Sequence, residues 1–392
     1  MKRVYLDYAA AAPMDPRVKR EILKYIDVFG NASSIHASGR EAKEIINKSK
    51  ERIGRVLHCR PEELVMTGSG TEANNLAIFG ILPQDGHIIS TNIEHHSVLR
   101  PLQKRGNVTF VPVKPNGIVD PKDIAKAIRP DTVLVSVIYA NNEIGTIQPI
   151  KEIAKKIENW KLEIHGKPPA FHVDSCQAAG YLNINVQELG VDLMTINGSK
   201  IYGPKGVGAL FVRRGTKLAP QILGGDQERG FRAGTQNPAL IAGFVKALEI
   251  ANSMREKESA RLEKLRDWFI SQIPEVKLNG DPILRLPNNI NISFDNIDGE
   301  MLMFRLDLHG IEVSTGAACT VSSNEPSHVL KAIVALPVTP SHPSPYNKGK
   351  VQEGVSAGNI RITLGRSTTK KDIEKTLEIL KREVNRQRFN RK

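Results

Sequence analysis

Short apolar runs alternate with amphipathic, helix-like segments through most of the first 212 residues. The alternation predicts an α/β fold with a parallel or mostly parallel sheet that helices cover on both faces. Ligands of such sheets bind beyond the carboxyl ends of the strands, so the residues that follow each run are the first candidates for a functional site. The apolar runs are 63–67, 87–90, 108–113, 133–139, 171–173, 193–196 and 208–212, and helical patterns fall near 97–105, 121–129, 150–161 and 185–190.

Further elements flank this region. Before it, a strand pattern at 3–6 precedes a helix that begins at Asp15-Pro16. The apolar stripe of this helix is Val18, Ile22, Ile26 and Phe29. A charged helix over about 36–57 follows it. After it, a long helix over 238–273 leads to a second region with strands at 289–294, 311–313 and 360–364 and a helix that begins at Thr369. A smaller α/β domain is therefore predicted to close the chain.

Charge and cysteine content limit the class of protein. The net charge of +13 favours acidic partners such as nucleic acid or phosphorylated cofactors, but the basic residues are scattered over presumed helix faces, which favours a solvated surface over an RNA site. Three cysteines without a CxxC pair indicate neither a disulfide framework nor a zinc site. With no signal-like start and no apolar run of 18 residues, we expect a cytoplasmic protein without a membrane segment.

Polar side chains follow four of the apolar runs, namely 94–96, 141–143, 174–177 and Lys200. Each has an ordinary alternative: Asp174 as a helix N-cap, His95 as a satisfied core histidine, Asn142 as a turn residue and Lys200 as a surface lysine. So many polar side chains at the ends of these runs are more than the solvation of loops requires. Burial at the end of a core strand lowers the pKa of a lysine, which an amine needs to form a Schiff base with an aldehyde cofactor.

A glycine turn between strand 63–67 and the next helix predicts an anion site, because exposed N–H groups and the helix dipole meet there. The turn reads Gly68-Ser69-Gly70-Thr71. Gly68-x-Gly70-x-x-Ala73 also fits a loose dinucleotide fingerprint, but no convincing acidic residue closes a second strand about 20 positions on. No Walker A sequence is present.

The smaller domain contains a loop of small residues, 314–323, around one thiol, Cys319. Small neighbours leave a cysteine accessible and its loop mobile, as a travelling nucleophile requires, although a lone cysteine is more often inert. Residues 337–358, with four prolines and no periodicity, are expected to form an exposed loop.

The chain closely resembles the pyridoxal-phosphate-dependent cysteine desulfurases that serve iron–sulfur cluster assembly and tRNA thiolation, within the class V aminotransferases of fold type I. The matching blocks run nearly from end to end in one order: Tyr5–Ala10, Phe29–Asn31, Thr71–Ala77, Glu94-His95, Asn141–Gly145, His172–Asp174, Lys200–Gly206, Glu228–Gly230 with Gly234-Thr235, Gly316–Thr320, and Ile360-Arg361 with Leu364–Arg366.

The resemblance implies a large pyridoxal-phosphate-binding domain, residues 16–255, with a mostly parallel seven-stranded sheet. It also implies a small domain, residues 1–15 and 256–392, that carries the catalytic cysteine loop. The expected reaction removes sulfur from L-cysteine, giving L-alanine and a persulfide on Cys319. Expected partners are L-cysteine, a second copy of the chain in a homodimer, and a sulfur-acceptor protein, either an iron–sulfur scaffold or a tRNA-thiolation enzyme, with no direct nucleic acid and no metal.

The resemblance also assigns site residues. Lys200 would hold the cofactor covalently, Asp174 would pair with its pyridinium nitrogen, and His95 would stack on its ring. Asn142 and Gln177 would contact the ring oxygen, and the phosphate would meet Gly70, Thr71, Asn197, Ser199 and, from the neighbouring subunit, Thr235. Arg361, with Asn142, would bind the substrate carboxylate. Lys200 or His95 would move protons, and the Cys319 thiolate would attack the substrate sulfur.

Three departures from the family pattern stand out. Asn197 and Ser199 replace a usual serine and histidine in the phosphate pocket, Cys176 replaces a threonine or alanine, and the loop over 337–358 is longer than expected. Two other functions remain open from sequence: a selenocysteine lyase or aminotransferase on the same scaffold, and a basic, non-catalytic RNA-binding protein.

Overall fold

The computed structural model describes residues 3–164, 168–316, 327–334 and 358–389. Its main feature is a seven-stranded sheet in the order β2-β8-β7-β6-β5-β3-β4. Only β8 runs antiparallel to its neighbours, so the predicted mostly parallel sheet of seven strands is confirmed. The strands are β2 (Leu64–Thr67), β3 (His87–Thr91), β4 (Val108–Val111), β5 (Thr132–Ile138), β6 (Ala170–Asp174), β7 (Leu193–Asn197) and β8 (Gly208–Val212).

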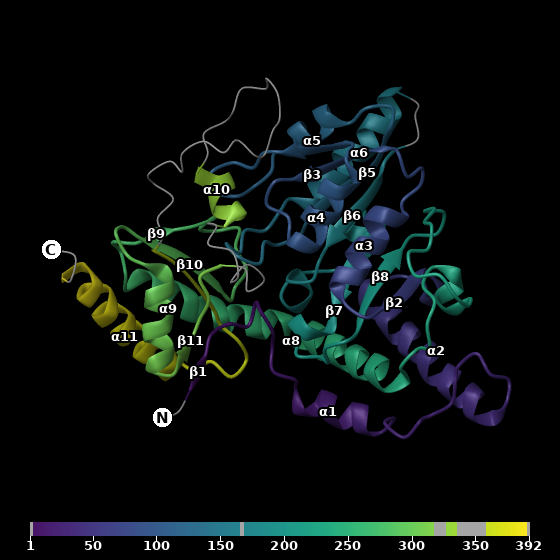
Figure 1. Cartoon of the computed structure of the whole chain (residues 1–392), viewed down its shortest axis with the longest axis horizontal. Helices are drawn as coiled ribbons and strands as arrows, with labels where there is room; N and C mark the ends of the chain where they lie inside the picture. Colours follow the sequence, from purple (N-terminus) through teal and green to yellow (C-terminus); the bar gives the residue numbers. More distant parts are fainter. Residues whose placement is uncertain (1–2, 165–167, 317–326, 335–357, 390–392) are drawn as a thin grey trace.

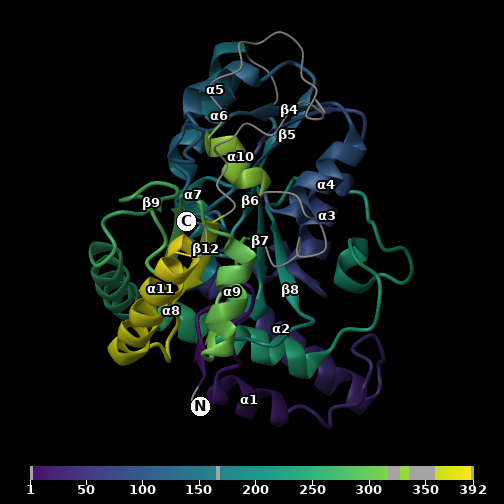
Figure 2. The ribbon, with the colours of Figure 1, turned by 60° about the vertical axis from the view of Figure 1, so that its left-hand side comes forward.

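Helices cover both faces of this sheet because successive side chains of each strand point to opposite sides. Leu193 and Leu210 belong to the apolar cluster under α3 and α4, whereas Met194 and Phe211 belong to the cluster under the other helices. Figure 2 shows α3 and α4 on one side of the central strands and α6 and α7 on the other. The helices are α2 (Ala37–Leu57), α3 (Gly70–Gly80), α4 (His96–Arg105), α5 (Pro121–Ala127), α6 (Ile150–Ile164) and α7 (Val186–Leu189).

A second, smaller α/β region has its own apolar core. Strand β10 (Asn289–Phe294) pairs antiparallel with β9 (Lys277–Leu278) and β12 (Gly358–Thr363), and β1 (Val4–Tyr5) pairs parallel with β11 (Ile311–Glu312). Helices α9 (Gly299–Leu308) and α11 (Lys370–Phe389) pack on these strands, and α10 (His328–Val334) lies on the side of the large sheet. The N-terminal strand therefore belongs to the same region as the C-terminal helix.

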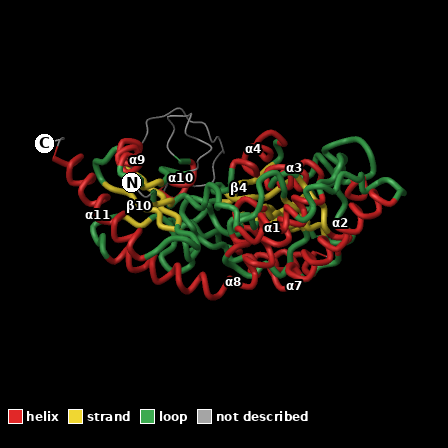
Figure 3. The backbone as a smooth tube through the Cα atoms, turned by 90° about the horizontal axis from the view of Figure 1, so that it is seen from below, coloured by secondary structure: helices red, strands yellow, loops and turns green. Residues whose placement is uncertain are grey.

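One long helix joins the two regions. Helix α8 (Pro238–Ser271) has 34 residues, and Figures 1 and 3 show it running beneath both parts of the molecule. Its first half, including Phe244, packs in the core of the large sheet, whereas Leu262 and Phe269 pack in the core of the smaller region. The predicted division between residues 255 and 256 falls inside this continuous helix, and the domain boundaries stay a prediction.

The predicted apolar stripe of the first helix was only partly right. Helix α1 (Pro16–Leu23) ends before Ile26, so the helical spacing that links Val18 to Ile26 and Phe29 stops there. Ile26 is 59% and Phe29 is 88% exposed, in a segment that projects from the body of the molecule (Figure 1). These two side chains thus have no core to fill within the described part of this chain.

Two features predicted from the sequence lie outside the described residues. They are Cys319 and the loop over 337–358, of which only Gly358 is described. Among the described helices, none combines the length and the apolar character needed to cross a lipid bilayer.

The central sheet buries a histidine, which predicts a loss of stability at mildly acidic pH. His172 lies in β6 between the hydroxyl oxygens of Ser136 (2.9 Å) and Thr195 (3.1 Å), and burial lowers its pKa from 6.5 to about 4. The folded protein therefore prefers the neutral ring, while the unfolded chain takes up a proton near pH 6.5. The stability due to this preference, about 3 kcal/mol, is present at pH 7 and is lost as the pH falls from about 6.5 to about 4.

Urea denaturation at pH 7, 5.5 and 4 measures this effect. The substitution His172→Gln, which keeps polar contacts but cannot titrate, should reduce the fall in unfolding free energy between pH 7 and 4 by about 3 kcal/mol relative to the unsubstituted protein. An unchanged pH dependence in the variant would show that this ring is not held neutral by burial.

Candidate active site

A cavity of about 270 Å³ opens at the carboxyl ends of the strands. It gathers ten of the predicted site residues, from six separate segments of the chain. These are Gly70, Thr71, His95, Asn142, Asp174, Gln177, Asn197, Ser199, Lys200 and Arg361. Of the other two predicted residues, Thr235 is exposed and does not line this cavity, and Cys319 lies outside the described residues.

Lys200 sits in a 3-10 turn, Gly198–Lys200, directly after β7. The side-chain oxygen of Asn197 caps this turn by accepting the Lys200 N–H at 3.3 Å. The Lys200 Nζ donates to the carbonyl oxygens of Ala9 at 2.8 Å and Ala10 at 2.6 Å. The N-terminal segment thus holds the amine at the cavity wall, and sequence reasoning had not assigned that segment to the site.

Asp174 is the last residue of β6 and is only 4% exposed. Its Oδ1 accepts the Cys176 N–H at 3.0 Å and its Oδ2 accepts the side-chain amide of Asn74 at 2.8 Å. Two donors therefore stabilise the carboxylate in a nearly dry site. Burial raises the pKa of the Cys176 thiol well above its ordinary value, so this cysteine stays protonated at the cavity wall.

His95 is the N-cap of α4, and its Nδ1 accepts the Ser97 N–H at 3.1 Å. The Ser97 Oγ lies 2.7 Å from the same nitrogen, and burial is the main cause that lowers the pKa of the imidazole. Sequence reasoning missed Ser97 and Asn74. A helical period was the available signal for Asn74, because it lies four residues after Gly70 and so shares its face of α3.

The start of α3 forms the predicted anion cradle. Ser69 caps the helix by accepting the Glu72 N–H at 3.1 Å, and Gly70 and Thr71 follow in the first turn. A Cβ at position 70 would lie 2.7 Å from the Cys176 sulfur, so any larger residue would have to displace that side chain. The backbone N–H groups of Gly70 and Thr71, in the first turn, and the positive end of the helix dipole favour a phosphate here.

Arg361 approaches the cavity from the other region, on β12, and is 1% exposed. Its Nη2 donates to Asp7 Oδ1 at 2.7 Å and its Nη1 to the Asn142 carbonyl at 3.2 Å. The Nε is buried without a hydrogen-bond partner among the described residues. A fixed guanidinium with an unused donor suits a carboxylate ligand. Asp7 was also missed, since nothing in the sequence links it to a residue so distant in the chain.

The remaining polar groups complete the cavity wall. The Gln177 Nε2 donates to the Ala9 carbonyl at 2.9 Å, and the Ser199 Oγ lies 3.4 Å from the Asn197 Oδ1. The set as a whole comprises an amine, a buried carboxylate, an imidazole and a helix start with a glycine cradle. These are the groups that pyridoxal phosphate needs for its aldehyde, pyridinium nitrogen, ring and phosphate, so the residues fit this cofactor.

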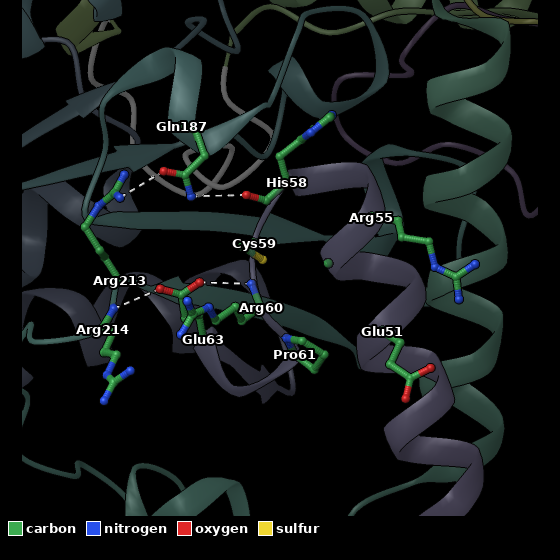
Figure 4. A pocket seen from close by; sticks show the side chains of 11 residues that line it. Glu51, Arg55, His58, Cys59, Arg60, Pro61, Glu63, Gln187, Arg213 and Arg214 are labelled. Carbon is green, nitrogen blue, oxygen red and sulfur yellow. Dashed lines mark hydrogen bonds between the residues drawn. The ribbon is translucent and has the colours of Figure 1, made fainter.

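A larger hollow, of about 1110 Å³, lies near the start of β2 and the end of the antiparallel β8, away from the carboxyl ends of the parallel strands (Figure 4). Figure 4 shows Gln187 between Arg213 and the His58 carbonyl, and Glu63 accepting backbone N–H groups. Burial, with a smaller effect of Glu63, raises the pKa of the Cys59 thiol to about 12. This hollow thus contains no ionised thiol and none of the predicted site residues.

The chain is similar to known proteins along almost its whole length. Residues 4–376 match the aminotransferase class-V family. The chain is 46% identical to the cysteine desulfurase IscS of Dictyoglomus turgidum, covering 99% of this chain and 96% of that one, and 42% identical to the cysteine desulfurase IscS 1 of Archaeoglobus fulgidus, covering 96% and 95%.

Solved structures give the same result. A NifS-like protein superposes with a TM-score of 0.86 at 31% identity, covering 98% of this chain and all of that one. A structure of SspA in complex with cysteine superposes with a TM-score of 0.75 at 32% identity, covering 93% of this chain and 99% of that one. The chain therefore belongs to the class V aminotransferase family, and within it to the pyridoxal-phosphate-dependent cysteine desulfurases.

Proposed function

We propose that this enzyme transfers the sulfur of L-cysteine to the thiol of Cys319, leaving L-alanine and an enzyme persulfide. The carbon–sulfur bond of the substrate breaks, a sulfur–sulfur bond forms on Cys319, and a proton takes the place of sulfur on the substrate carbon. The observation that carries the proposal is the convergence of Lys200, Asp174, His95 and Arg361 on one cavity. Selenocysteine lyase or simple aminotransferase activity is not favoured, because the relatives described above are cysteine desulfurases.

Pyridoxal phosphate, when bound, supplies an electron sink for the bonds at the substrate Cα. Lys200 would hold it covalently, and Asp174 would keep its ring nitrogen protonated. Gly70, Thr71, Asn197 and Ser199 would hold its phosphate at the start of α3, whose dipole favours an anion. Asn142 and Gln177 would contact the ring oxygen, since both line the same cavity.

Arg361 would bind the substrate carboxylate. Asp7 and the Asn142 carbonyl hold its guanidinium in one orientation, which reduces the entropy that binding must overcome. Proton movements at the Cα would fall to Lys200 and His95, and burial favours the neutral His95 imidazole, which still carries one ring proton.

The described residues on either side of Cys319 support its role. Ser314 pairs with Arg361 through two backbone hydrogen bonds, of 3.1 and 2.6 Å. After the undescribed stretch, the Ser327 Oγ donates to Glu143 at 2.5 Å, and Glu143 follows Asn142 of the cavity. Ser314 and Ser327, which flank the undescribed stretch, are therefore both held next to residues of the cavity.

A second copy of the chain would complete the site. Thr235 is exposed and does not line the cavity of its own chain, so its proposed contact with the phosphate requires a neighbouring subunit. Leu23, Ile26, Phe29 and Ile35 are 55–90% exposed around the projecting end of α1, an apolar surface that a partner subunit would cover.

The acceptor of the persulfide sulfur would be a protein of iron–sulfur cluster assembly or tRNA thiolation. The IscS names of the relatives support the first of these. We propose a cytoplasmic location, because two of the three cysteines are free thiols in the described part of the chain and Cys319 must stay reduced to act.

Two substitutions separate cofactor binding from sulfur transfer. Cys319→Ala should keep the absorbance of bound pyridoxal phosphate but lower sulfide and alanine release from cysteine by at least roughly 100-fold. Lys200→Ala should lose both the covalently bound cofactor and the activity. Absorbance spectra and alanine assays measure both outcomes, and sulfide release by Cys319→Ala at the normal rate would overturn the role of this thiol.

A third substitution tests carboxylate binding. Arg361→Lys should raise the KM for cysteine roughly 10- to 100-fold, because lysine cannot make two parallel hydrogen bonds, while the cofactor spectrum stays unchanged. Arg266, equally buried but bonded to backbone carbonyls of the smaller region, is the matched control. Arg266→Lys should change stability and leave the KM unchanged. An unchanged KM in Arg361→Lys would exclude Arg361 from substrate binding.

A further inference from the structure

A chain of buried hydrogen bonds connects Asp174 to His95 through two residues that sequence reasoning had not assigned to the site. The Asn74 side-chain amide donates to Asp174 Oδ2 at 2.8 Å and to the Ser97 Oγ at 2.8 Å. The Ser97 Oγ lies 2.7 Å from His95 Nδ1. Asn74 is fully buried, and Ser97 and Asp174 are 8% and 4% exposed, so water does not compete for these bonds.

The direction of every bond in this chain follows from its two ends. An ionised carboxylate only accepts, so the Asn74 amide must turn its NH2 group, and not its oxygen, towards Asp174. The second hydrogen of that NH2 group is donated to the Ser97 Oγ. The Ser97 hydroxyl hydrogen is then available to His95 Nδ1, to which the Ser97 backbone N–H also donates, at 3.1 Å. Two donors therefore face a single nitrogen.

We propose that Asn74 and Ser97 are positioning residues that hold His95 in the neutral form with its proton on Nε2. A proton on Nδ1 would point at the Ser97 N–H, so both the other tautomer and the doubly protonated ring are disfavoured. This inference rests on the proposed function only in giving the Nε2–H a task, namely to offer its proton to the reacting groups in the cavity. The hydrogen-bond pattern itself does not depend on any bound cofactor.

The charged and titratable groups around His95 do not reverse this preference. Asp174 raises its pKa, while Lys200, His96 and His328 lower it, and burial has the largest effect. His96 and His328, whose ring centres lie 4.7 Å apart, both have lowered pKa values through burial, so neither brings a stable positive charge. Glu94, directly before His95, is buried with a pKa raised to about 8, so its carboxyl is mostly neutral at pH 7.

The experiment compares Ser97→Ala with the unsubstituted holoenzyme. Nitrogen-15 NMR of histidine-labelled protein reports which ring nitrogen carries the proton, and a His95→Asn sample assigns the signals. We expect His95 to be the Nε2–H tautomer, and Ser97→Ala to add a population with a proton on Nδ1 and to raise the pH at which the ring titrates. The kcat should fall about tenfold with little change in KM, and the acidic limb of the kcat/KM profile should move to higher pH.

Three further variants guard against a merely structural effect. Ser97→Thr keeps the hydroxyl and should restore the wild-type NMR signals and pH profile. Asn74→Ala should shift the His95 signals in the same direction as Ser97→Ala, and it serves as the second test if Ser97→Ala folds poorly. The control is Ser136→Ala, which removes a buried serine bonded to His172 Nδ1 in the sheet and should lower stability without moving the His95 signals.

The outcomes distinguish this inference from the proposed function. If neither Ser97→Ala nor Asn74→Ala changes the His95 tautomer or its titration, the positioning role is wrong, whatever the activity. If His95→Ala forms alanine at the wild-type rate while Ser97→Ala still changes the tautomer, the hydrogen-bond role holds and the proposed proton transfer by His95 is wrong.

Discussion

The register of the parallel strands is the constraint on which the rest of this structure depends. The last residues of β5 and β6, Ile138 and Asp174, pair with each other, and Asp174 also pairs with Thr195 of β7, two residues before that strand ends. Both faces of the sheet are packed with apolar side chains, and a shift by one residue would exchange those faces. Packing of the core therefore places Asn142, Asp174 and Lys200 at one edge, and polar contacts only adjust their orientation.

This dependence explains which parts of the molecule the sequence could predict. The order and period of the apolar runs were enough for the mostly parallel sheet and for His95, Asn142, Asp174 and Lys200 as strand-end residues. Arg361 could not be reached in this way, because it arrives on a strand of another sheet, and only the family resemblance supplied it. Asn74 and Ser97 lie inside helices, where periodicity alone does not separate a polar residue that faces a cavity from one that faces water.

The apolar stripe predicted through Ile26 and Phe29 was wrong for a related reason. An apolar periodicity can continue past the end of a helix, and it does not show which part of the molecule covers those side chains.

The N-terminal segment has a larger part in the site than its length suggests. Its backbone carbonyls at Ala9 and Ala10 accept hydrogen bonds from Lys200 and Gln177, and the side chain of Asp7 pairs with Arg361. The Tyr5 hydroxyl donates to the backbone carbonyl oxygens of Asp7 and Ala11 and so helps to hold the same segment in place. One short run of backbone thus connects the groups proposed for the cofactor with the group proposed for the substrate. Loss of this segment would disturb both at once.

Helix α8 has a mechanical consequence of a different kind. A helix of 34 residues is about 50 Å long and takes part in the cores of both regions. Because this connection is a continuous helix and not a flexible linker, tilting one region against the other requires the helix to bend. Its backbone hydrogen bonds resist that bending. The elasticity of that helix therefore helps to limit how far the guanidinium of β12 and the amine beyond β7 drift apart in thermal motion.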